Sequence, residues 1–331
     1  MIQKKENNMN KLKVNLIGIF ILATFMIVPT VVFANSAEII EPEVIPVSNN
    51  MLRGSNSIDI QNEPLELIGN ELNEFELNQI YEKYYEVYPE YKDSSESIKF
   101  IDSETKKEIL YDEQVKTTIS PRLAMTKVNA KQNPYYSTAN IHTYWFRPNN
   151  QVYTAVGSGF YSGGQNVATA AHVVYNKKLG GWATYASVAF GRNGAHDYLW
   201  YVETNNFTSL QGYLDNPKVG MYDIAKIRGT VWSNHGVPVR PLIGTSTGKF
   251  TASNYGYPGS LAGYSGFEQY VASGTFEFEG TMYKTTNTFA KPGMSGGPLN
   301  TNGVVGLLSG GTNTTDYYVP MYASYMDFFR N

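Results

Sequence analysis

Three short segments of the sequence carry residue types that together can break an acyl bond by nucleophilic attack. His172 ends a run of small and apolar residues, Asp223 precedes the apolar run Ile-Ala-Lys-Ile, and Ser295 lies in Gly-Met-Ser-Gly-Gly-Pro. A serine hydroxyl becomes a strong nucleophile when a histidine accepts its proton and a carboxylate orients that histidine. We therefore predict a catalytic triad of Ser295, His172 and Asp223.

The glycines beside Ser295 predict a second feature of such a site. They let the backbone turn tightly, so that the N–H groups of Gly293 and Ser295 can converge on one point. Two convergent donors form an oxyanion hole, and each typically contributes about 3 kcal/mol of transition-state stabilisation. Taken alone, each pattern has an ordinary structural explanation: a histidine bonded to backbone, an aspartate capping a turn, or a Gly-rich turn between strands. Their occurrence together in one chain favours catalysis.

Short β-strands are the elements that must position these residues. From about Thr126 onward, alternating or wholly apolar runs are separated by Gly, Asn and Pro, which is typical of a β-sandwich or β-barrel. In this part of the chain, only residues 321–329 have the pattern of a helix. The strands that we predict cover residues 141–146, 152–161, 167–170, 198–203, 222–227, 270–278, 283–289 and 304–308.

Composition and charge narrow the class of protein. The chain has no cysteine, which excludes disulfides, cysteine-ligated zinc and thiol nucleophiles. Basic residues beyond residue 122 are scattered rather than clustered, so we expect no nucleic-acid partner. Residues 35–122 are acidic on balance and residues 123–331 are basic. The two parts either attract each other or form independently solvated surfaces.

The first third of the chain predicts export and processing. Basic residues precede an apolar stretch at 14–34 that ends in small residues, which indicates a signal peptide over residues 1–34; a transmembrane anchor is the alternative. Apolar residues then recur at helical spacing between about 65 and 84. Residues 35–122 are predicted to be a partly helical, acidic prosegment, cut between about 116 and 126, where Lys116 and Arg122 are candidate processing points. The alternative is an accessory domain that stays attached.

From about Thr126 to its C-terminus, the sequence resembles the trypsin-like serine proteases of the bacterial secreted glutamyl endopeptidase group. The triad order His, Asp, Ser is that of the chymotrypsin-type arrangement. Two further segments, Gly-Tyr-Pro-Gly at 256–259 and Val-Val-Gly-Leu-Leu-Ser-Gly-Gly at 304–311, resemble a turn of the family and its strand beside the specificity pocket. The resemblance implies an all-β fold of two six-stranded antiparallel β-barrels, a zymogen, and peptide-bond hydrolysis through an acyl-enzyme on Ser295.

The expected specificity pocket is where the sequence departs from this family. Glutamate-cleaving members place a histidine where this chain has Leu308, and a buried substrate carboxylate without a polar partner is unfavourable by several kcal/mol. Two preferences for the residue before the scissile bond therefore stay open. The family resemblance favours glutamate, whereas Leu308 favours an apolar residue. An inward-pointing Lys291 would favour an acidic residue. The substrate-binding residues that we predict are Phe289, Ala290, Lys291, Leu308, Ser309 and Gly310.

These observations predict a secreted, extracellular serine endopeptidase with residues 123–331 as its protease domain. The mechanism needs no metal or organic cofactor. Its partners are polypeptide substrates and, before maturation, its own prosegment; we expect a monomer that is free of the membrane after signal cleavage. The alternative from another class is a non-catalytic protein that holds a peptide on the same scaffold.

Overall fold

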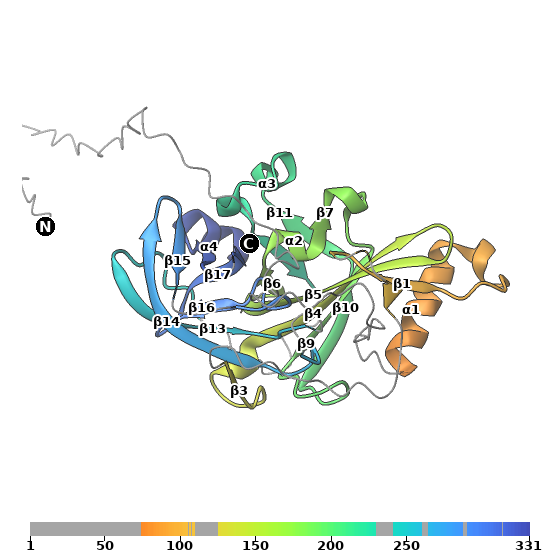
Figure 1. Ribbon diagram of the computed structural model, residues 1–331, viewed down its shortest axis with the longest axis horizontal. Coiled ribbons are helices and arrows are strands. Elements are labelled where there is room, and N and C mark those ends of the chain that lie inside the picture. The colour runs from red at the N-terminus through yellow and green to blue at the C-terminus, as the bar shows by residue number, and fades with distance from the viewer. Residues whose placement is uncertain are drawn as a thin grey trace, which may run out of the picture. The chain divides into compact units, whose positions relative to one another are not determined.

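The computed structural model describes residues 74–104, 106, 108–109, 125–229, 241–259, 264–286, 290–312 and 314–331. The fold is mostly β, with two main sheets and a few short helices (Figure 1). The predicted signal peptide, the first part of the predicted prosegment and most of the predicted processing region lie outside the described residues. In the part of the chain that the structure describes, no helix is both long and apolar enough to cross a bilayer.

The first sheet is antiparallel along most of its length and has the strand order β10-β9-β4-β5-β6-β12-β11. Two short strands from the N-terminal part extend it, because β1 pairs in parallel with β5 and β2 pairs with β1. The strands are β1 (Lys99–Asp102), β2 (Glu108–Ile109), β4 (Thr138–Arg147), β5 (Gln151–Gly163), β6 (Asn166–Thr169), β9 (Tyr185–Phe190), β10 (Trp200–Thr204), β11 (Asn206–Ser209) and β12 (Ala225–Arg228).

The second sheet has the order β13-β16-β17-β18-β15-β14, and an additional pairing of β13 with β14 closes these six strands into a barrel. Strand β3 pairs with β14 outside this ring. The strands are β3 (Thr126–Lys127), β13 (Lys249–Gly256), β14 (Tyr270–Glu279), β15 (Met282–Thr285), β16 (Pro298–Asn300), β17 (Val304–Gly311) and β18 (Asp316–Pro320), and a separate ribbon pairs β7 (Tyr175–Asn176) with β8 (Gly181–Trp182).

Helices are short and lie mainly at the ends of strands. The α-helices are α1 (Glu74–Val87), α2 (Ala171–Val174), α3 (Gln211–Asp215) and α4 (Ala323–Arg330), and the 3-10 helices are η2 (Pro89–Tyr91), η3 (Tyr135–Ser137), η4 (Lys177–Leu179) and η5 (Gly220–Tyr222). Helix α1 ends before Pro89, whose ring cannot continue a helix. Helix α4 is the predicted C-terminal helix.

One apolar core joins the two sheets. It contains side chains from the first sheet, such as Ile141 and Phe160, together with Leu307 and Val319 from the second. Helix α4 adds Phe329, whose ring lies edge-on to that of Phe160 at 6.4 Å between centroids. Burying apolar surface from both sheets in one core stabilises their packing against each other. This packing brings the ends of β6, β12 and β17 together.

The predicted architecture of two antiparallel β-barrels with a C-terminal helix is confirmed. Each predicted strand overlaps an observed one. The strand expected at 222–227 begins later, at Ala225, because residues Gly220–Tyr222 form a turn of 3-10 helix. The first sheet holds more than six strands, because the N-terminal part contributes β1 and β2 to it.

Candidate active site

His172 lies in the single turn of helix α2 that follows strand β6. The other members of this turn, Ala171, Val173 and Val174, are buried in the apolar core. His172 is the member that faces outward, with 34% of its side chain exposed. The residues directly before it, Ala170 and Ala171, are small and fully buried.

Asp223 is fully buried directly after the η5 turn and is held by three hydrogen bonds. Its Oδ1 accepts from the backbone N–H of His172 at 3.0 Å, and its Oδ2 lies 2.8 Å from His172 Nδ1. The Ser309 hydroxyl donates to the same Oδ2 at 2.6 Å. A buried carboxylate is tolerated only when its charge is satisfied in this way. An Nδ1–H that donates to Asp223 leaves Nε2 of His172 free to accept a proton.

The electrostatics of the pair favour a basic imidazole. Burial favours the neutral form of His172, but the negative charge of Asp223 and its hydrogen bond act in the opposite direction. The carboxylate of Glu104, from the N-terminal part of the chain, acts in the same direction as Asp223. The pKa of His172 is therefore raised above its ordinary value, which makes the imidazole a stronger proton acceptor.

Ser295 lies in a tight turn that is hydrogen-bonded to strands β5 and β17. Its carbonyl accepts from the Ser158 N–H at 2.7 Å, and the next residue, Gly296, donates to the Leu308 carbonyl at 2.7 Å. A Cβ on Gly296 would lie 2.2 Å from Thr169 Oγ1, so the turn approaches the end of β6 as closely as glycine allows. Among the described contacts, the Ser295 hydroxyl makes no hydrogen bond to His172. Such bonds often tighten only when substrate is bound.

Gly293 has a backbone conformation that glycine adopts without strain. Its φ of +93° is in the left-handed region, and an added Cβ would lie 2.5 Å from both the Gly259 N and the Tyr257 carbonyl. The Gly259 N–H donates to the Pro292 carbonyl at 2.7 Å, so the turn at 256–259 supports this loop. Within the described residues, the N–H groups of Gly293 and Ser295 have no hydrogen-bond acceptor. Backbone N–H groups of this kind can donate to a substrate oxygen.

The predicted pocket residues are brought together only in part. Ala290 and Leu308 are both buried in the core of the second barrel, whereas Phe289 lies outside the described residues. Gly310 follows a register irregularity in the pairing of β17 with β18. Ser309 directs its hydroxyl to Asp223, so that its side chain helps to hold this buried carboxylate.

Asp316 is a residue of this region that sequence reasoning missed. It is 1% exposed, pairs with Gly311 across β17 and β18, and accepts from the Ala290 N–H at 2.8 Å. Burial raises the pKa of Asp316 to about 8, although the Ala290 N–H and the charge of Lys291 act in the opposite direction. The available signal was an aspartate at the head of an apolar strand, which is the same signal that identified Asp223.

Comparisons with known proteins support the fold. The chain is similar to a solved Glu endopeptidase in complex with MPD (23% identity, TM-score 0.50, 62% of this chain and 94% of that one). It is also similar to the protease Anisep from Arthrobacter nicotinovorans (17% identity, TM-score 0.50, 61% and 97%) and to HL collagenase (14% identity, TM-score 0.50, 62% and 96%). No family model and no curated protein matches the sequence. The protein has the chymotrypsin fold of these serine proteases.

Proposed function

We propose that this protein is a serine endopeptidase in which Ser295 is the nucleophile. The observation that carries the proposal is that the buried Asp223 binds both the backbone N–H and the imidazole of His172. In addition, the N–H groups of Gly293 and Ser295 have no acceptor among the described residues. This arrangement provides a nucleophile, a base, an orienting acid and an oxyanion hole on a fold shared with known proteases.

The mechanism follows from the roles of these groups. Ser295 Oγ forms a bond to the substrate carbonyl carbon while its proton moves to Nε2 of His172, and Asp223 stabilises the imidazolium. The N–H groups of Gly293 and Ser295 hold the oxyanion. His172 then gives the proton to the leaving amine as the C–N bond breaks. A water molecule, activated by the same histidine, hydrolyses the acyl-enzyme and restores Ser295.

Labelling by a fluorophosphonate tests this proposal, because the reagent reacts with an activated serine. We expect the processed protein to be labelled and to digest casein, and Ser295→Ala to lose both properties, with turnover reduced on the order of 10⁶-fold. Ser273→Ala, which removes an exposed hydroxyl from β14, is the matched control and should behave as the parent does. A labelled Ser295→Ala protein would show that another serine is the activated one. An unlabelled parent that still binds peptides would favour the non-catalytic alternative.

The residue preferred before the scissile bond is proposed to be apolar at neutral pH and not glutamate. Leu308 supplies no hydrogen bond to a substrate carboxylate, and a protonated Asp316 supplies no positive charge. Above about pH 8 the ionised Asp316 would increasingly favour a basic residue. This proposed preference is supported by the contact between Ala290 and Asp316, because Ala290 lies directly before the loop that contains Ser295.

Matched peptides that differ only at this residue, comparing Glu, Asp, Leu, Phe, Ala and Lys, test the preference. We expect Leu or Phe to be cleaved best at pH 6.5, and the ratio of kcat/KM for Lys over Leu to rise from pH 6.5 to pH 9. The rise should be absent in Asp316→Asn. A preference for Glu above a hundredfold, which is about 2.7 kcal/mol in transition-state binding, would refute the apolar-pocket proposal.

Export and activation by cleavage complete the proposal. The chain is proposed to be secreted after removal of residues 1–34 and to become active when it is cut between residues 116 and 126. The support is the basic and apolar N-terminal sequence and the change from acidic to basic composition near residue 122. N-terminal sequencing of the protein from culture medium tests this step. Full-length, uncut and fully active protein in the medium would contradict it.

A further inference from the structure

Residues 74–109, which the sequence assigns to a removable prosegment, share an apolar cluster with the first barrel. Ile80 and Tyr84 of α1 pack with Tyr144 and Phe146 of β4 and with Tyr185 of β9. The rings of Tyr84 and Phe146 meet edge-on at 5.5 Å between centroids. All five side chains are buried. Removal of the segment would expose large apolar side chains on both partners, which is unfavourable in water.

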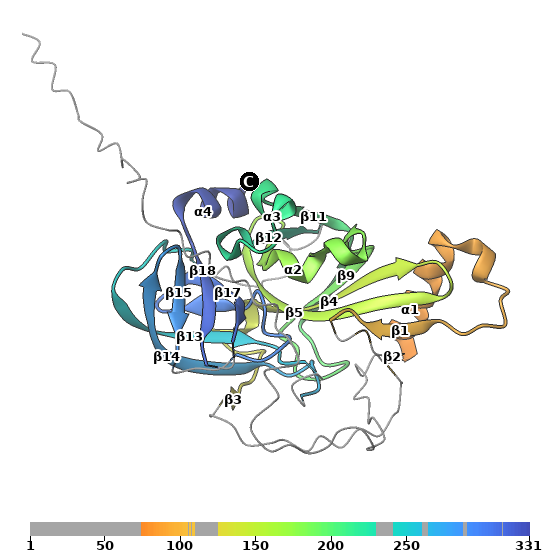
Figure 2. The ribbon, with the colours of Figure 1, turned by 45° about the horizontal axis from the view of Figure 1, so that its top comes forward.

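The outward face of β4 is therefore an interface rather than a surface. Side chains alternate along this strand, so that Ala139 and Ile141 enter the core shared by the two sheets, whereas Tyr144 and Phe146 point to α1. Figure 2 shows α1 and β1 lying against the end of the β4–β5 hairpin. A strand that is apolar on both faces needs a cover on each of them.

Polar contacts tie the same segment to the turn between β4 and β5. The Tyr84 hydroxyl donates to the Arg147 carbonyl at 2.9 Å and accepts from the Asn150 N–H at 2.8 Å. The Asn150 side-chain amide donates to the Glu96 carbonyl at 2.9 Å. These bonds satisfy backbone groups of the barrel that would lose their partners if the segment left.

Strand β1 continues the attachment along β5. It pairs in parallel with residues Gln151 to Thr154, and the Ser103 N–H donates to the Thr154 carbonyl at 2.8 Å. Strand β6 pairs with β5 only from Gly159 onward. In the described part of the chain, β1 is thus the strand that covers this edge of β5. Unpaired sheet edges are prone to association with other chains, so removal of β1 would create such an edge.

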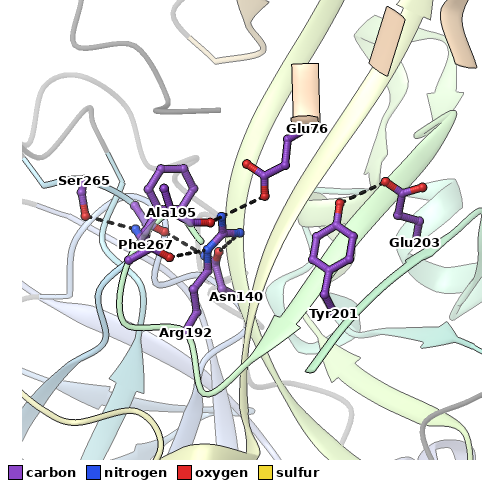
Figure 3. Close-up of polar contacts among 10 residues, drawn as sticks. Glu76, Asn140, Arg192, Ala195, Tyr201, Glu203, Ser265 and Phe267 are labelled. Atoms are coloured by element: carbon purple, nitrogen blue, oxygen red, sulfur yellow. Dashed lines mark hydrogen bonds and ion pairs between the residues drawn. The ribbon is translucent and has the colours of Figure 1, made fainter. Parts of the chain in front are cut away.

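A buried ion pair links α1 to the barrel (Figure 3). Arg192 is 1% exposed, lies 4.1 Å from the ring centroid of Phe267, and donates to the side chain of Asn140 at 3.3 Å. Its Nη2 donates to Glu76 of α1 at 2.9 Å, and Glu76 is 6% exposed. Among the described residues, Glu76 is the one carboxylate that pairs with this guanidinium. A buried charge that loses its partner is strongly destabilising.

We propose that residues 74–109 stay bound after the chain is cut between residues 116 and 126, as a non-covalent subunit of the mature protein. The surface formed by Tyr144, Phe146, Tyr185 and Arg192 is the docking site, and the chain's own N-terminal segment is its occupant. This favours the attached accessory domain over the removable prosegment. The Glu104 carboxylate after β1 also favours the protonated form of His172. The inference rests on the cleavage proposed above but not on catalysis by Ser295.

The experiment uses the full chain with Ser295→Ala, in which a recognition sequence for a sequence-specific protease replaces residues 116–122. After complete cutting, the sample is run on size exclusion in native buffer and in guanidinium chloride, and each peak is identified by mass. We expect the two fragments to elute together in native buffer and to separate only in denaturant. Separate elution in native buffer would overturn the proposal.

Two glutamine substitutions on the same helix test the buried pair. Glu76→Gln keeps a hydrogen-bond acceptor but removes the charge that faces Arg192, whereas Glu86→Gln makes the same change at an exposed position. On dilution of the cut protein, we expect the dissociation constant to rise at least tenfold for Glu76→Gln and to stay within twofold for Glu86→Gln. Equal dissociation constants for the two variants would refute the docking role of the pair. Far-UV circular dichroism of the uncut variants checks that both fold.

Discussion

Replacing Asp316 by asparagine should change how the stability of the protein depends on pH. Burial raises the pKa of Asp316 from 3.8 to about 8, so the folded protein keeps this carboxyl neutral up to about pH 8. The unfolded chain ionises it near 3.8. Between these values unfolding releases one proton, and the free energy of unfolding falls by about 1.4 kcal/mol per pH unit as pH rises. Over the whole window this is on the order of 5 kcal/mol.

The measurement compares two proteins over this pH window. Asparagine keeps the shape of Asp316 and an acceptor for the Ala290 N–H, but it cannot ionise. With Ser295→Ala in both proteins to prevent self-digestion, guanidinium unfolding gives the free energy of unfolding at each pH from 5 to 9. The free energy of unfolding of Asp316→Asn, relative to that of the parent, should rise by about 4 kcal/mol from pH 5 to pH 8 and then level off.

Other groups titrate in the same window, but they cancel in the difference between variant and parent. Asp327→Asn makes the same substitution at an exposed position of α4 and serves as the control. The difference in the free energy of unfolding between Asp327→Asn and the parent should not change by several kcal/mol from pH 5 to pH 9. A constant difference between Asp316→Asn and the parent from pH 5 to pH 9 would show that Asp316 is already ionised in the fold. The burial argument, and the pH-dependent specificity derived from it, would then be wrong.

Two further substitutions test the site. Ser309→Ala removes the hydroxyl that donates to Asp223 at 2.6 Å, a charge-assisted bond typically worth about 1.5–3 kcal/mol. We expect the free energy of unfolding to fall by a comparable amount and the turnover of peptide substrates to fall about tenfold or more. Unchanged stability and turnover would contradict this role of Ser309. Gly293→Ala places a Cβ 2.5 Å from the Gly259 N, which displaces the oxyanion loop and should lower kcat about a hundredfold or more. Gly280→Ala, also at positive φ but in open space, should retain activity, and equal effects of the two glycine substitutions would argue against the loop geometry.

Much of the candidate site was predictable because its signals are local. Gly293 and Gly296 both have positive φ and close backbone neighbours, and such sterics select glycine at positions that can be read beside Ser295. His172 follows small residues for a similarly local reason. The strands were predictable because side chains alternate along them with a period of two, whatever the partner strand is.

Contacts between distant segments were decided only by the tertiary structure. Ser309 was predicted as a substrate-binding residue, and only the tertiary structure shows that its hydroxyl donates to Asp223. Asp316 meets Ala290 because β18 pairs with β17 near the loop that contains Ser295. Helix α1 had a helical pattern in the sequence, but its pairing of Glu76 with Arg192 depends on which barrel face it covers. Strand order and sheet curvature determine which distant residues meet. Both depend on the packing of the whole chain and not on the spacing of neighbouring residues.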